Sequence, residues 1–435
     1  MKTDNLAILG GEKAVKTPLK RYNAIGQQEI DAALEVVQTG ILSKYLGAWH
    51  EDFYGGPKVR EFEEKAANYF SVKHAVTMNS WTSGLIAAVG AIGIEPGDEV
   101  IVTPWTMCAS ATAILHWNAI PVFADIDEES FNISPKEIEK VITPYTKAIM
   151  SVDIFGQSAD MDDIMRIASE RNLKVISDTA QAPGAMYKGQ YAGTFSHVGG
   201  FSLNYHKHIH TGEGGIVVTN DDGIAERLQL IRNHAEAVLD HEDKKNSSLV
   251  NMIGHNFRLG EIECAIGIQQ LKKLKGIVQG RCKRAQALTE NLAELPGLIV
   301  PRIKADRTHV YYTYGMQLET ERLEVSRKTI ALALQAEGVP VTSKYQNLHL
   351  LPQYQQKIAY GSKGFPWSSA ICHREVNYDK GICPVAEKLQ DETYMGLGIC
   401  EYELEPHEIE QISTAFRKVW NNLDHLRSFN ETKGS

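Results

Sequence analysis

The sequence SLNYHKHIHTGEGG, residues 202–215, places a serine and a lysine ahead of a glycine-rich turn. Glycine has no side chain, so the backbone amides of a turn at 212–215 can approach a bound anion closely. The β-branched residues that follow, 216–219, predict a strand, and 220–223 predict a further turn. We therefore expect Lys207 to lie on a connection between ordered elements, where its amine and the hydroxyl of Ser202 meet one anionic ligand.

Short apolar runs alternate with segments of helical spacing ahead of this stretch. The strand candidates are 75–78, 99–103, 122–126, 148–152 and 174–178, and the helix candidates between them include 59–70, 135–141 and 162–171. Such alternation is typical of an α/β fold with a mainly parallel sheet, which binds ligands at the carboxyl ends of its strands. Asp178 ends one of these strands, and the small residues 79–84 lead into a helix whose N-terminal amides favour an anion.

The alternation gives way to a different pattern near residue 296. Further segments with helical spacing are 28–38, 261–274, 281–295, 326–337 and 406–423, and a strand is predicted over 309–316. The order of elements after Pro296 is an α+β pattern. We therefore expect a large domain over residues 1–295, with a lead-in segment at 1–40, and a smaller C-terminal domain over residues 296–435.

Composition bounds the class of protein. The 435 residues allow a large core, and 43% hydrophobic and 23% charged residues are ordinary for a soluble globular protein. A formal net charge of −9 argues against nucleic acid or an anionic membrane as the main partner. The first residues lack the apolar core of a signal peptide and no run approaches the ~18 apolar residues of a membrane span, so we expect a cytoplasmic protein. Its six scattered cysteines are expected to be reduced thiols.

The spacing of Ser202, Lys207 and the Gly-Glu-Gly-Gly turn resembles that of the DegT/DnrJ/StrS family of sugar aminotransferases, which depend on pyridoxal 5'-phosphate (PLP). Their motif is serine, four residues, lysine, four residues and Gly-Glu-Gly-Gly, and the resemblance covers nearly the whole chain. It implies the PLP-dependent transferase fold type I, like that of aspartate aminotransferase, with PLP held by Lys207 as a Schiff base. A dehydratase branch carries histidine in place of this lysine, so Lys207 favours the aminotransferase branch.

The resemblance also implies roles for residues at other family motifs. Asp178 would meet the ring nitrogen of PLP and keep it protonated, so that the ring accepts electrons, and Gln181 would lie near the ring oxygen. Met107, where the family commonly has an aromatic residue, would cover the ring through its polarizable thioether, or Trp105 would do so. Lys207 and Asp178 are the implied catalytic residues, and the implied cofactor-binding residues are Thr82, Ser83, Met107, Asp178, Gln181, Ser202, Lys207 and Asn256.

Two further positions bear on the phosphate of PLP. Trp81 stands where the family usually has glycine, directly before the phosphate-binding positions of Thr82 and Ser83. Asn256 lies in a segment, 254–258, that resembles the one which crosses the dimer interface and gives an asparagine to the neighbouring subunit's PLP phosphate. The resemblance therefore implies a homodimer with shared active sites.

Other interpretations of these residues stay open. Lys207 can be a solvated loop lysine beside an ordinary hairpin turn, and an aspartate at a strand end is often a helix cap. His206, His208 and His210 alternate and would share one face of an extended segment, which suggests a metal site. Zinc sites usually add cysteine or carboxylate ligands at recognisable spacing, so we expect no metal.

Two loops have interpretations of their own. The aromatic segment 42–57 either contacts substrate or packs on its own aromatic residues. Residues 351–384, rich in tyrosine, glycine and proline and without a clear period, are expected to form a substrate lid.

We expect an aminotransferase that moves an amino group from an amino acid to a keto or aldehyde group of a sugar, nucleotide-sugar, keto-sugar acid or cyclitol. The resemblance implies L-glutamate as donor, with L-glutamine as the alternative of the cyclitol branch. Two alternative functions are a PLP-dependent dehydratase of keto-deoxy sugars and a PLP-binding regulatory protein without turnover. The cofactor motifs fit each class of acceptor equally well.

Overall fold

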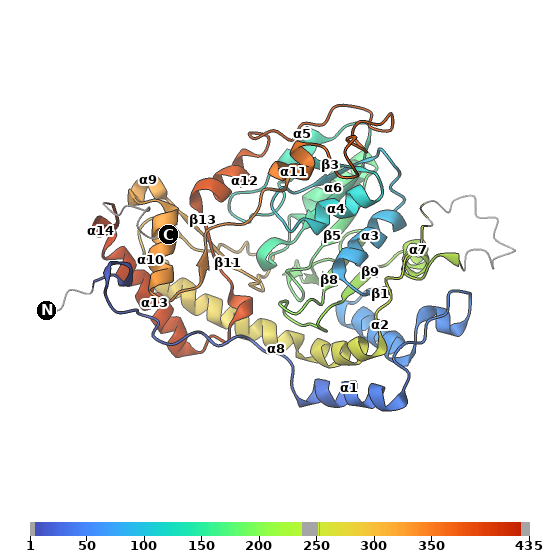
Figure 1. Cartoon of the computed structure of the whole chain (residues 1–435), viewed down its shortest axis with the longest axis horizontal. Helices are drawn as coiled ribbons and strands as arrows, with labels where there is room; N and C mark the ends of the chain where they lie inside the picture. The colour runs from blue at the N-terminus through green and yellow to red at the C-terminus, as the bar shows by residue number, and fades with distance from the viewer. Residues whose placement is uncertain (1–4, 237–250, 252, 428–435) are drawn as a thin grey trace.

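The computed structural model describes residues 5–236, 251 and 253–427, in which the two larger of three sheets are joined by one long helix (Figure 1). The larger sheet has seven strands in the order β1-β9-β8-β5-β4-β2-β3. Its strands are β1 His74–Met78, β2 Glu99–Val102, β3 Ile120–Phe123, β4 Thr146–Val152, β5 Lys174–Asp178, β8 Val198–Ser202 and β9 Gly215–Thr219.

Five neighbouring strands of this sheet, from β3 to β8, run parallel, whereas β9 is antiparallel to both β8 and β1. The prediction of an α/β fold with a mainly parallel sheet is confirmed. The helices that follow or precede its strands are α2 Pro57–Phe70, α3 Trp81–Ala91, α4 Ala109–His116, α5 Pro135–Val141, α6 Met161–Arg171 and α7 Asp222–Arg232.

Apolar residues on the two faces of the sheet belong to two cores. Along β9, Val217 packs with the core that includes α3, α4 and α7, while Ile216 and Val218 pack with α2 and helix α8, Glu261–Leu292. Alternate residues of a strand point to opposite faces, so one strand serves both cores. A Cβ on Gly267 of α8 would lie 2.6 Å from the ring of Phe62, so this glycine allows α2 to approach closely.

The second sheet is antiparallel, in the order β10-β11-β13-β12, and is covered by helices from the C-terminal part of the chain. Its elements are β10 Leu298–Ile299, β11 Tyr314–Leu318, β12 Val341–Thr342, β13 Tyr394–Leu397, α10 Arg327–Ala336 and α13 Pro406–Trp420. Short elements elsewhere are β6 Met186–Tyr187, β7 Gln190–Tyr191, α9 Thr320–Leu323, α11 Pro352–Gln355, α12 Pro384–Lys388 and α14 Leu423–Arg427, with single turns at Ala7–Leu9, Glu51–Tyr54, Ile154–Gly156, Leu348–Leu350, Leu389–Thr393 and Ile399–Glu401. None of the helices in the described part of the chain is long and apolar enough to cross a membrane.

The first described residues pack on this second sheet's core, although the lead-in segment was expected to belong to the large domain. Leu6 and Val15 are buried in the same core as Leu334 and Phe416. The backbone amides of Ala7 and Ala14 donate to the carboxylate of Glu337 at 2.7 and 2.9 Å. The start of the lead-in segment therefore packs with the C-terminal part of the chain. A domain boundary near residue 295 stays a prediction.

Two predicted elements differ from the observed ones. The predicted helices 261–274 and 281–295 are one continuous helix, α8, because Gly276 and Gly280 cost a helix only about 1 kcal/mol each and do not break it. The predicted strand 309–316 begins only at Tyr314, because Tyr311 has a positive φ of 53° that interrupts extended backbone.

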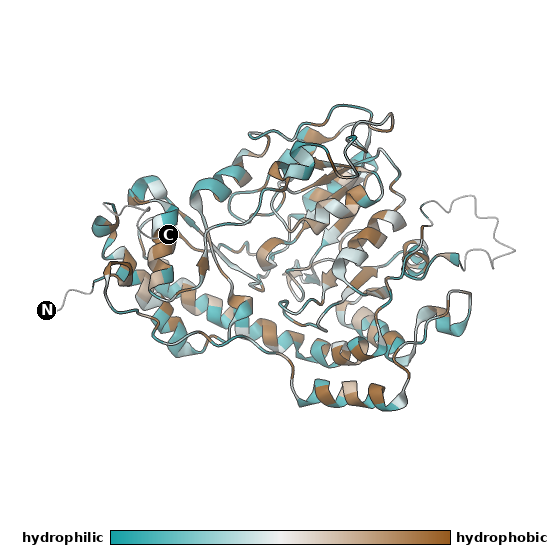
Figure 2. Ribbon diagram, in the orientation of Figure 1, coloured by the Kyte–Doolittle hydropathy of each residue, from teal (hydrophilic) through white to brown (hydrophobic). Residues whose placement is uncertain are grey.

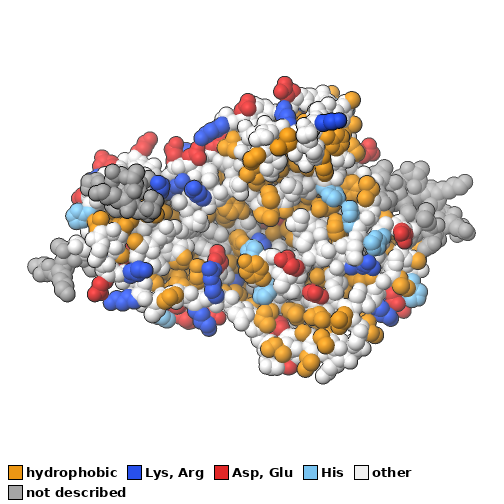
Figure 3. Space-filling view, viewed as in Figure 1, with side chains coloured by type: hydrophobic (Ala, Val, Ile, Leu, Met, Phe, Trp, Pro, Cys, Tyr) orange, Lys and Arg blue, Asp and Glu red, His pale blue; other side chains and the backbone are white. Residues whose placement is uncertain are grey.

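Helix α1, Gln27–Thr39, confirms the predicted helix 28–38, but three of its apolar residues are exposed. Ile30, Leu34 and Val37 are 54%, 51% and 52% exposed, whereas Ala32 and Val36 pack against α8. The same exposed character continues at Ile41, Leu42 and Leu46. The apolar stripe is visible along α1 in Figure 2, and hydrophobic side chains gather over the same part of the molecule in Figure 3.

The prediction that residues 351–384 form a substrate lid is wrong within the single chain, because the segment is anchored at the other end of the sheet. Arg374 Nε donates to Glu99 Oε1 at 2.7 Å, and the Tyr378 hydroxyl donates to the carbonyl of Pro121 at 2.7 Å. Glu99 begins β2 and Pro121 lies at the start of β3, so the segment is anchored at the amino ends of these strands. Ligands bind at the opposite, carboxyl ends of parallel strands.

Candidate active site

A cavity of about 200 Å³ opens at the carboxyl ends of the parallel strands. It lies between the N-terminus of α3, the ends of β5 and β8, and the connection from β8 to β9. The predicted site residues on its wall are Thr82, Met107, Asp178, Gln181, Ser202 and Lys207, joined by Ser80, Trp81, Leu85, Thr106, Ala109, Val152, Ala180, Asn204, His206 and Glu213. The structure thus brings six of the eight residues of the predicted site together.

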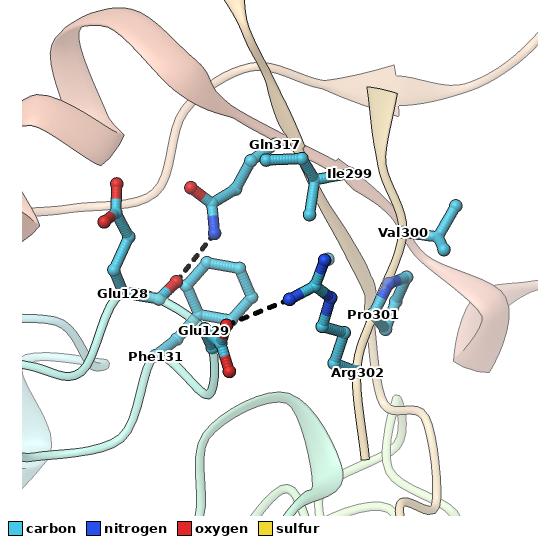
Figure 4. Close-up of a pocket in the computed structure, with 9 residues that line it drawn as sticks. Glu128, Glu129, Phe131, Ile299, Val300, Pro301, Arg302 and Gln317 are labelled. Atoms are coloured by element: carbon cyan, nitrogen blue, oxygen red, sulfur yellow. Dashed lines mark hydrogen bonds and ion pairs between the residues drawn. The ribbon is translucent and has the colours of Figure 1, made fainter. Parts of the chain in front are cut away.

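A separate hollow of about 170 Å³ lies beside the smaller sheet and has a different character (Figure 4). Its polar groups bond one another: the Gln317 amide donates to the carbonyl of Glu128 at 2.6 Å, and Arg302 pairs with Glu129 at 3.1 Å. The predicted site residues do not line it. The cavity at the strand ends is therefore the candidate active site.

Lys207 is buried on the connection between β8 and β9, with 9% of its surface exposed. Burial lowers its pKa from 10.5 to about 8, because a charged amine loses hydration there, while Asp178 acts in the opposite direction. The amine lies 4.3 Å from the centre of the Tyr312 ring, which attracts the ammonium form electrostatically. The reading of Lys207 as a solvated loop lysine does not fit this environment.

Asp178 ends β5 with its carboxylate facing the cavity and 4% exposed. Oδ1 accepts hydrogen bonds from the indole Nε1 of Trp81 at 2.7 Å and from the amide of Ala180 at 3.2 Å. Oδ2 accepts one from the hydroxyl of Ser110 at 2.7 Å. A carboxylate has about four lone-pair sites, so a further donor in the cavity can still be accepted.

Gln181 is held on the same wall. Its Oε1 accepts from the amide of Phe155 at 2.8 Å, and its Nε2 donates to the hydroxyl of Tyr345 at 3.1 Å. Burial raises the pKa of Tyr345 to about 12, so the phenol stays protonated near neutral pH. The side-chain amide of Gln181 therefore has a defined orientation with its remaining N–H free to donate elsewhere.

Ser80 caps the helix that supplies the anion end of the cavity. Its hydroxyl accepts from the amide of Ser83 at 3.0 Å, and the Ser83 hydroxyl donates to Asn79 Oδ1 at 2.7 Å. Ser83 is thus engaged within the cap and does not line the cavity, whereas Thr82 does. The N-terminal amides and dipole of α3 favour an anion here.

Met107, rather than Trp105, lies on the cavity wall. Met107 is 59% exposed, and its sulfur accepts the amide of Ala109 at 3.1 Å. Trp105 is fully buried and packs against Tyr345 and Tyr394, with ring centres 5.5 and 5.4 Å away. Of the two alternatives for covering the cofactor ring, the geometry favours Met107.

Asn256 lies outside the cavity of its own chain and is exposed. Its Oδ1 accepts from Arg258 Nε at 2.9 Å, which leaves the amide nitrogen to donate elsewhere. Its backbone forms an isolated bridge with Asn233, whose amide donates to the carbonyls of Leu46 and Phe53. The segment that carries Asn256 therefore adjoins the exposed apolar residues at 41–46.

The histidines beside Lys207 go to different neighbours. His206 lines the cavity, His208 is buried against the carbonyl of Val310 at 2.9 Å, and His210 Nδ1 accepts the amide of Gly212 at 3.3 Å. They do not converge on one point as a metal site would require.

The aromatic segment 42–57 packs on its own rings. Trp49 and Phe53 lie 4.5 Å apart, Phe53 meets Tyr54 edge-on at 5.4 Å, and Phe53 is fully buried. The segment does not reach the cavity wall. Packing on its own aromatics is the alternative that this structure supports.

Several site residues carried no usable sequence signal. Ser110, Tyr312 and Tyr345 reach the cavity residues only through the tertiary fold, and nothing in their local sequence marks them. Ser80 could have been found, because a serine directly before a helix is a typical N-cap. Trp81 was marked only by its departure from the family's glycine.

Comparisons with known proteins point to one family. The model of the DegT/DnrJ/EryC1/StrS aminotransferase family matches residues 45–394. The chain is 36% identical over 300 residues to the GDP-perosamine synthase of Caulobacter vibrioides, covering 69% of this chain and 79% of that protein. It is 34% identical over 368 residues to the UDP-N-acetyl-3-dehydro-alpha-D-glucosamine 3-aminotransferase of Acidithiobacillus ferrooxidans, covering 84% and 90%. Among solved structures, an aminotransferase from Psychrobacter cryohalolentis matches with a TM-score of 0.78 and 32% identity, covering 94% of this chain and all of that one.

Proposed function

Because the chain belongs to the DegT/DnrJ/EryC1/StrS aminotransferase family, we propose that its sugar aminotransferase chemistry takes place at Lys207 and Asp178 in the cavity at the strand ends. The family implies PLP as the cofactor. One observation carries the proposal: a buried lysine with a pKa of about 8 shares a cavity with a fixed carboxylate and a helix N-terminus. An amine, an acid and an anion site are the groups that PLP requires.

The residues present fit the cofactor. Asp178 would hold the ring nitrogen, Gln181 the ring oxygen, and Thr82, Ser202 and the α3 amides the phosphate, with Met107 against the ring. When bound, PLP supplies an electron sink for the carbon that loses its proton. The acceptor-only carboxylate of Asp178, held by three donors, favours a protonated ring nitrogen.

Lys207 supplies the proton transfer. A general base works best when its pKa lies near the operating pH, and burial brings the amine from 10.5 to about 8. The freed amine would take a proton at Nζ from the α-carbon of the amino donor and deliver it to the carbon of the cofactor that had been bonded to Lys207, and the Tyr312 ring at 4.3 Å would stabilise the ammonium form between these two transfers. One residue thus acts as both base and acid.

The acceptor we propose is a keto-sugar linked to a nucleoside diphosphate, with L-glutamate as donor. The names of the relatives in Caulobacter vibrioides and Acidithiobacillus ferrooxidans both specify a nucleotide-linked sugar. The cofactor cavity itself does not separate this class from free keto-sugar acids or cyclitols. The lysine at position 207 disfavours the dehydratase alternative.

Isotope transfer tests this function. PLP-loaded protein is incubated with L-glutamate labelled at the amino nitrogen and with GDP-linked or UDP-linked keto-sugars, a free keto-sugar acid, or a cyclitol ketone. We expect mass spectrometry to find the label in a nucleotide-linked amino sugar. Label found only in the product of the free acid or of the cyclitol would reassign the substrate class. If neither labelled L-glutamate nor labelled L-glutamine used in its place transfers label to any acceptor, the proposal is contradicted.

We further propose a homodimer in which each subunit gives Asn256 to its partner's cofactor phosphate. Lys207 is the one lysine or arginine among the described residues on the cavity wall, so a donor from a second subunit would add to the hydroxyls and amides that face a dianionic phosphate there. Asn256, with Arg258 bound to it, is exposed on the segment that adjoins the apolar residues at 41–46 and the stripe on α1. A second copy would cover that apolar surface and receive the asparagine.

Subunit complementation is the corresponding prediction. In a mixed dimer of Lys207→Ala and Asn256→Ala subunits, a shared site puts both lesions in one cavity and neither in the other. With distinguishable tags and purification as a heterodimer, activity should approach half that of the unmodified dimer, provided that Asn256→Ala alone is clearly impaired. A heterodimer no more active than its parent homodimers would place Asn256 in its own subunit's site or outside any site.

A further inference from the structure

Trp81 makes a hydrogen bond to a residue that is far away in the sequence. It is the first residue of α3, 5% exposed, and its indole Nε1 donates to Oδ1 of Asp178 at 2.7 Å. Both side chains line the same cavity. A hydrogen bond that ends on a charged group is shorter and about twice as strong as a neutral one.

Glycines on three elements make room for Trp81. A Cβ built on Gly200 would lie 2.3 Å from Cζ3 of Trp81, one on Gly84 2.7 Å from Cε3, and one on Gly215 2.8 Å from Cα. Real Cβ atoms do not approach other atoms so closely, so Gly200 and Gly84 must lack a side chain for the ring to sit there, and Gly215 must lack one for the backbone of Trp81 to approach. Gly200 is also the residue of β8 that pairs in register with Asp178 of β5. Strand β8, next to the Asp178 carboxylate, therefore leaves space for the indole that donates to this carboxylate.

Each oxygen of the Asp178 carboxylate accepts a hydrogen bond from a different side chain. Trp81 holds Oδ1 and Ser110 holds Oδ2, each at 2.7 Å and from different helices. Donors on both oxygens prevent rotation of the carboxylate and aim its remaining lone pairs into the cavity. Preorganised groups of this kind need no rearrangement during the reaction.

We propose that Trp81 is a positioning residue that sets the orientation of the Asp178 carboxylate toward the ring nitrogen of the cofactor. This inference rests on the proposed role of Asp178. Trp81 acts through Asp178, and its indole N–H, not its bulk, is the effective group. The indole thereby has a function at a position where a glycine could offer no side-chain donor.

The chain contains a matched control in Trp117. This residue is also 5% exposed and also donates one indole hydrogen bond at 2.7 Å, in this case to the carbonyl of Ile86. It does not line the cavity. Trp117→Phe therefore removes an indole hydrogen bond of the same length, to a neutral acceptor, without touching Asp178.

The test compares Trp81→Phe, Trp117→Phe and Asp178→Asn in protein loaded with PLP labelled with nitrogen-15 in its ring. Nuclear magnetic resonance reports protonation of the ring nitrogen as a function of pH. We expect Trp81→Phe to lower the pH midpoint of that signal and to lower kcat about tenfold, with the KM for the sugar nearly unchanged. Trp117→Phe should change neither quantity, and Asp178→Asn should shift the midpoint furthest.

The outcomes separate the inference from the function on which it rests. If Asp178→Asn shifts the midpoint but Trp81→Phe behaves like Trp117→Phe, the role of Trp81 is overturned and that of Asp178 stands. If Asp178→Asn leaves the midpoint unchanged, the proposed role of Asp178 fails and the inference fails with it. Should Trp81→Phe not fold, Trp81→benzothienylalanine keeps the indole shape and lacks the N–H, and the same expectations apply.

Discussion

Replacing Lys207 by alanine is expected to lower the transamination rate by at least about 10³-fold, because one amine supplies both the covalent anchor and the proton carrier. Lys207→Arg should be equally inactive, since a guanidinium stays protonated and cannot act as base. The rate is measured as transfer of labelled nitrogen from L-glutamate to the sugar. Borohydride reduction followed by mass spectrometry should find the cofactor attached to Lys207 in the unmodified protein and at no residue in either variant.

Lys188→Ala is the matched control, because Lys188 is an exposed lysine paired with Asp162 on the surface. It should retain the full rate and the reduced cofactor adduct at Lys207. Normal turnover in Lys207→Ala would remove this residue from the mechanism.

The same lysine predicts a pH dependence. Burial favours the neutral amine, so the folded pKa of about 8 lies below the ordinary 10.5. Between these values the unfolded chain binds a proton that the folded, cofactor-free protein does not, and the contribution of Lys207 to stability therefore rises with pH across this window. Reductive methylation of the cofactor-free protein, read by mass spectrometry of the Lys207 peptide, should show a midpoint near pH 8. A midpoint like that of surface lysines would contradict the burial argument.

The second large effect is expected for Asp178→Asn, which should lower the rate by about 10²–10³-fold. The substitution keeps the size of the side chain and removes the negative charge that favours a protonated ring nitrogen. The amide also places a donor among Trp81, Ser110 and the amide of Ala180, which all donate to this position. The cofactor should remain attached to Lys207. Borohydride trapping should therefore still find the adduct at Lys207 in Asp178→Asn, although its turnover is reduced.

Asp163→Asn on the exposed face of α6 serves as the control, and it should leave the rate unchanged. Asp178→Glu tests the geometry, because the longer side chain keeps the charge but displaces it from its two side-chain donors. Full activity of Asp178→Asn would exclude the carboxylate from the chemistry.

Local motifs predicted the parts of the site that lie along short stretches of chain. Lys207 with its glycine turn, Asp178 with Gln181, and Thr82 at a helix start each combine a strand end with a recognisable residue pattern. Ser110 and Tyr345 could not be predicted, because they reach Asp178 and Gln181 from elements far away in sequence. The close packing of Trp81 depends on Gly84 of its own helix and on Gly200 and Gly215, which meet it only in the folded chain.

The errors in the fold have related causes. Hydrophobic periodicity located α1 but could not tell that Ile30, Leu34 and Val37 are exposed, because an exposed apolar face has the same spacing of residues as a buried one. The loop at 351–384 has no period, and the side chains that anchor it, such as Tyr378 and Arg374, contact strand starts more than 250 residues earlier in the chain.

The packing of Leu6 and Val15 in the C-terminal core has a consequence for synthesis of the chain. The Ala7 amide and Glu337 carboxylate that bond there are separated by 330 residues, so this contact cannot form until most of the polypeptide has left the ribosome. The intervening sheet can assemble earlier, while the apolar residues at the start of the chain wait without their partners. Contacts of such sequence separation form late and slowly. Nascent chains whose synthesis has stopped before Glu337 would therefore carry a folded large sheet and a first segment without its packing partners. Such chains would be the species most in need of a chaperone.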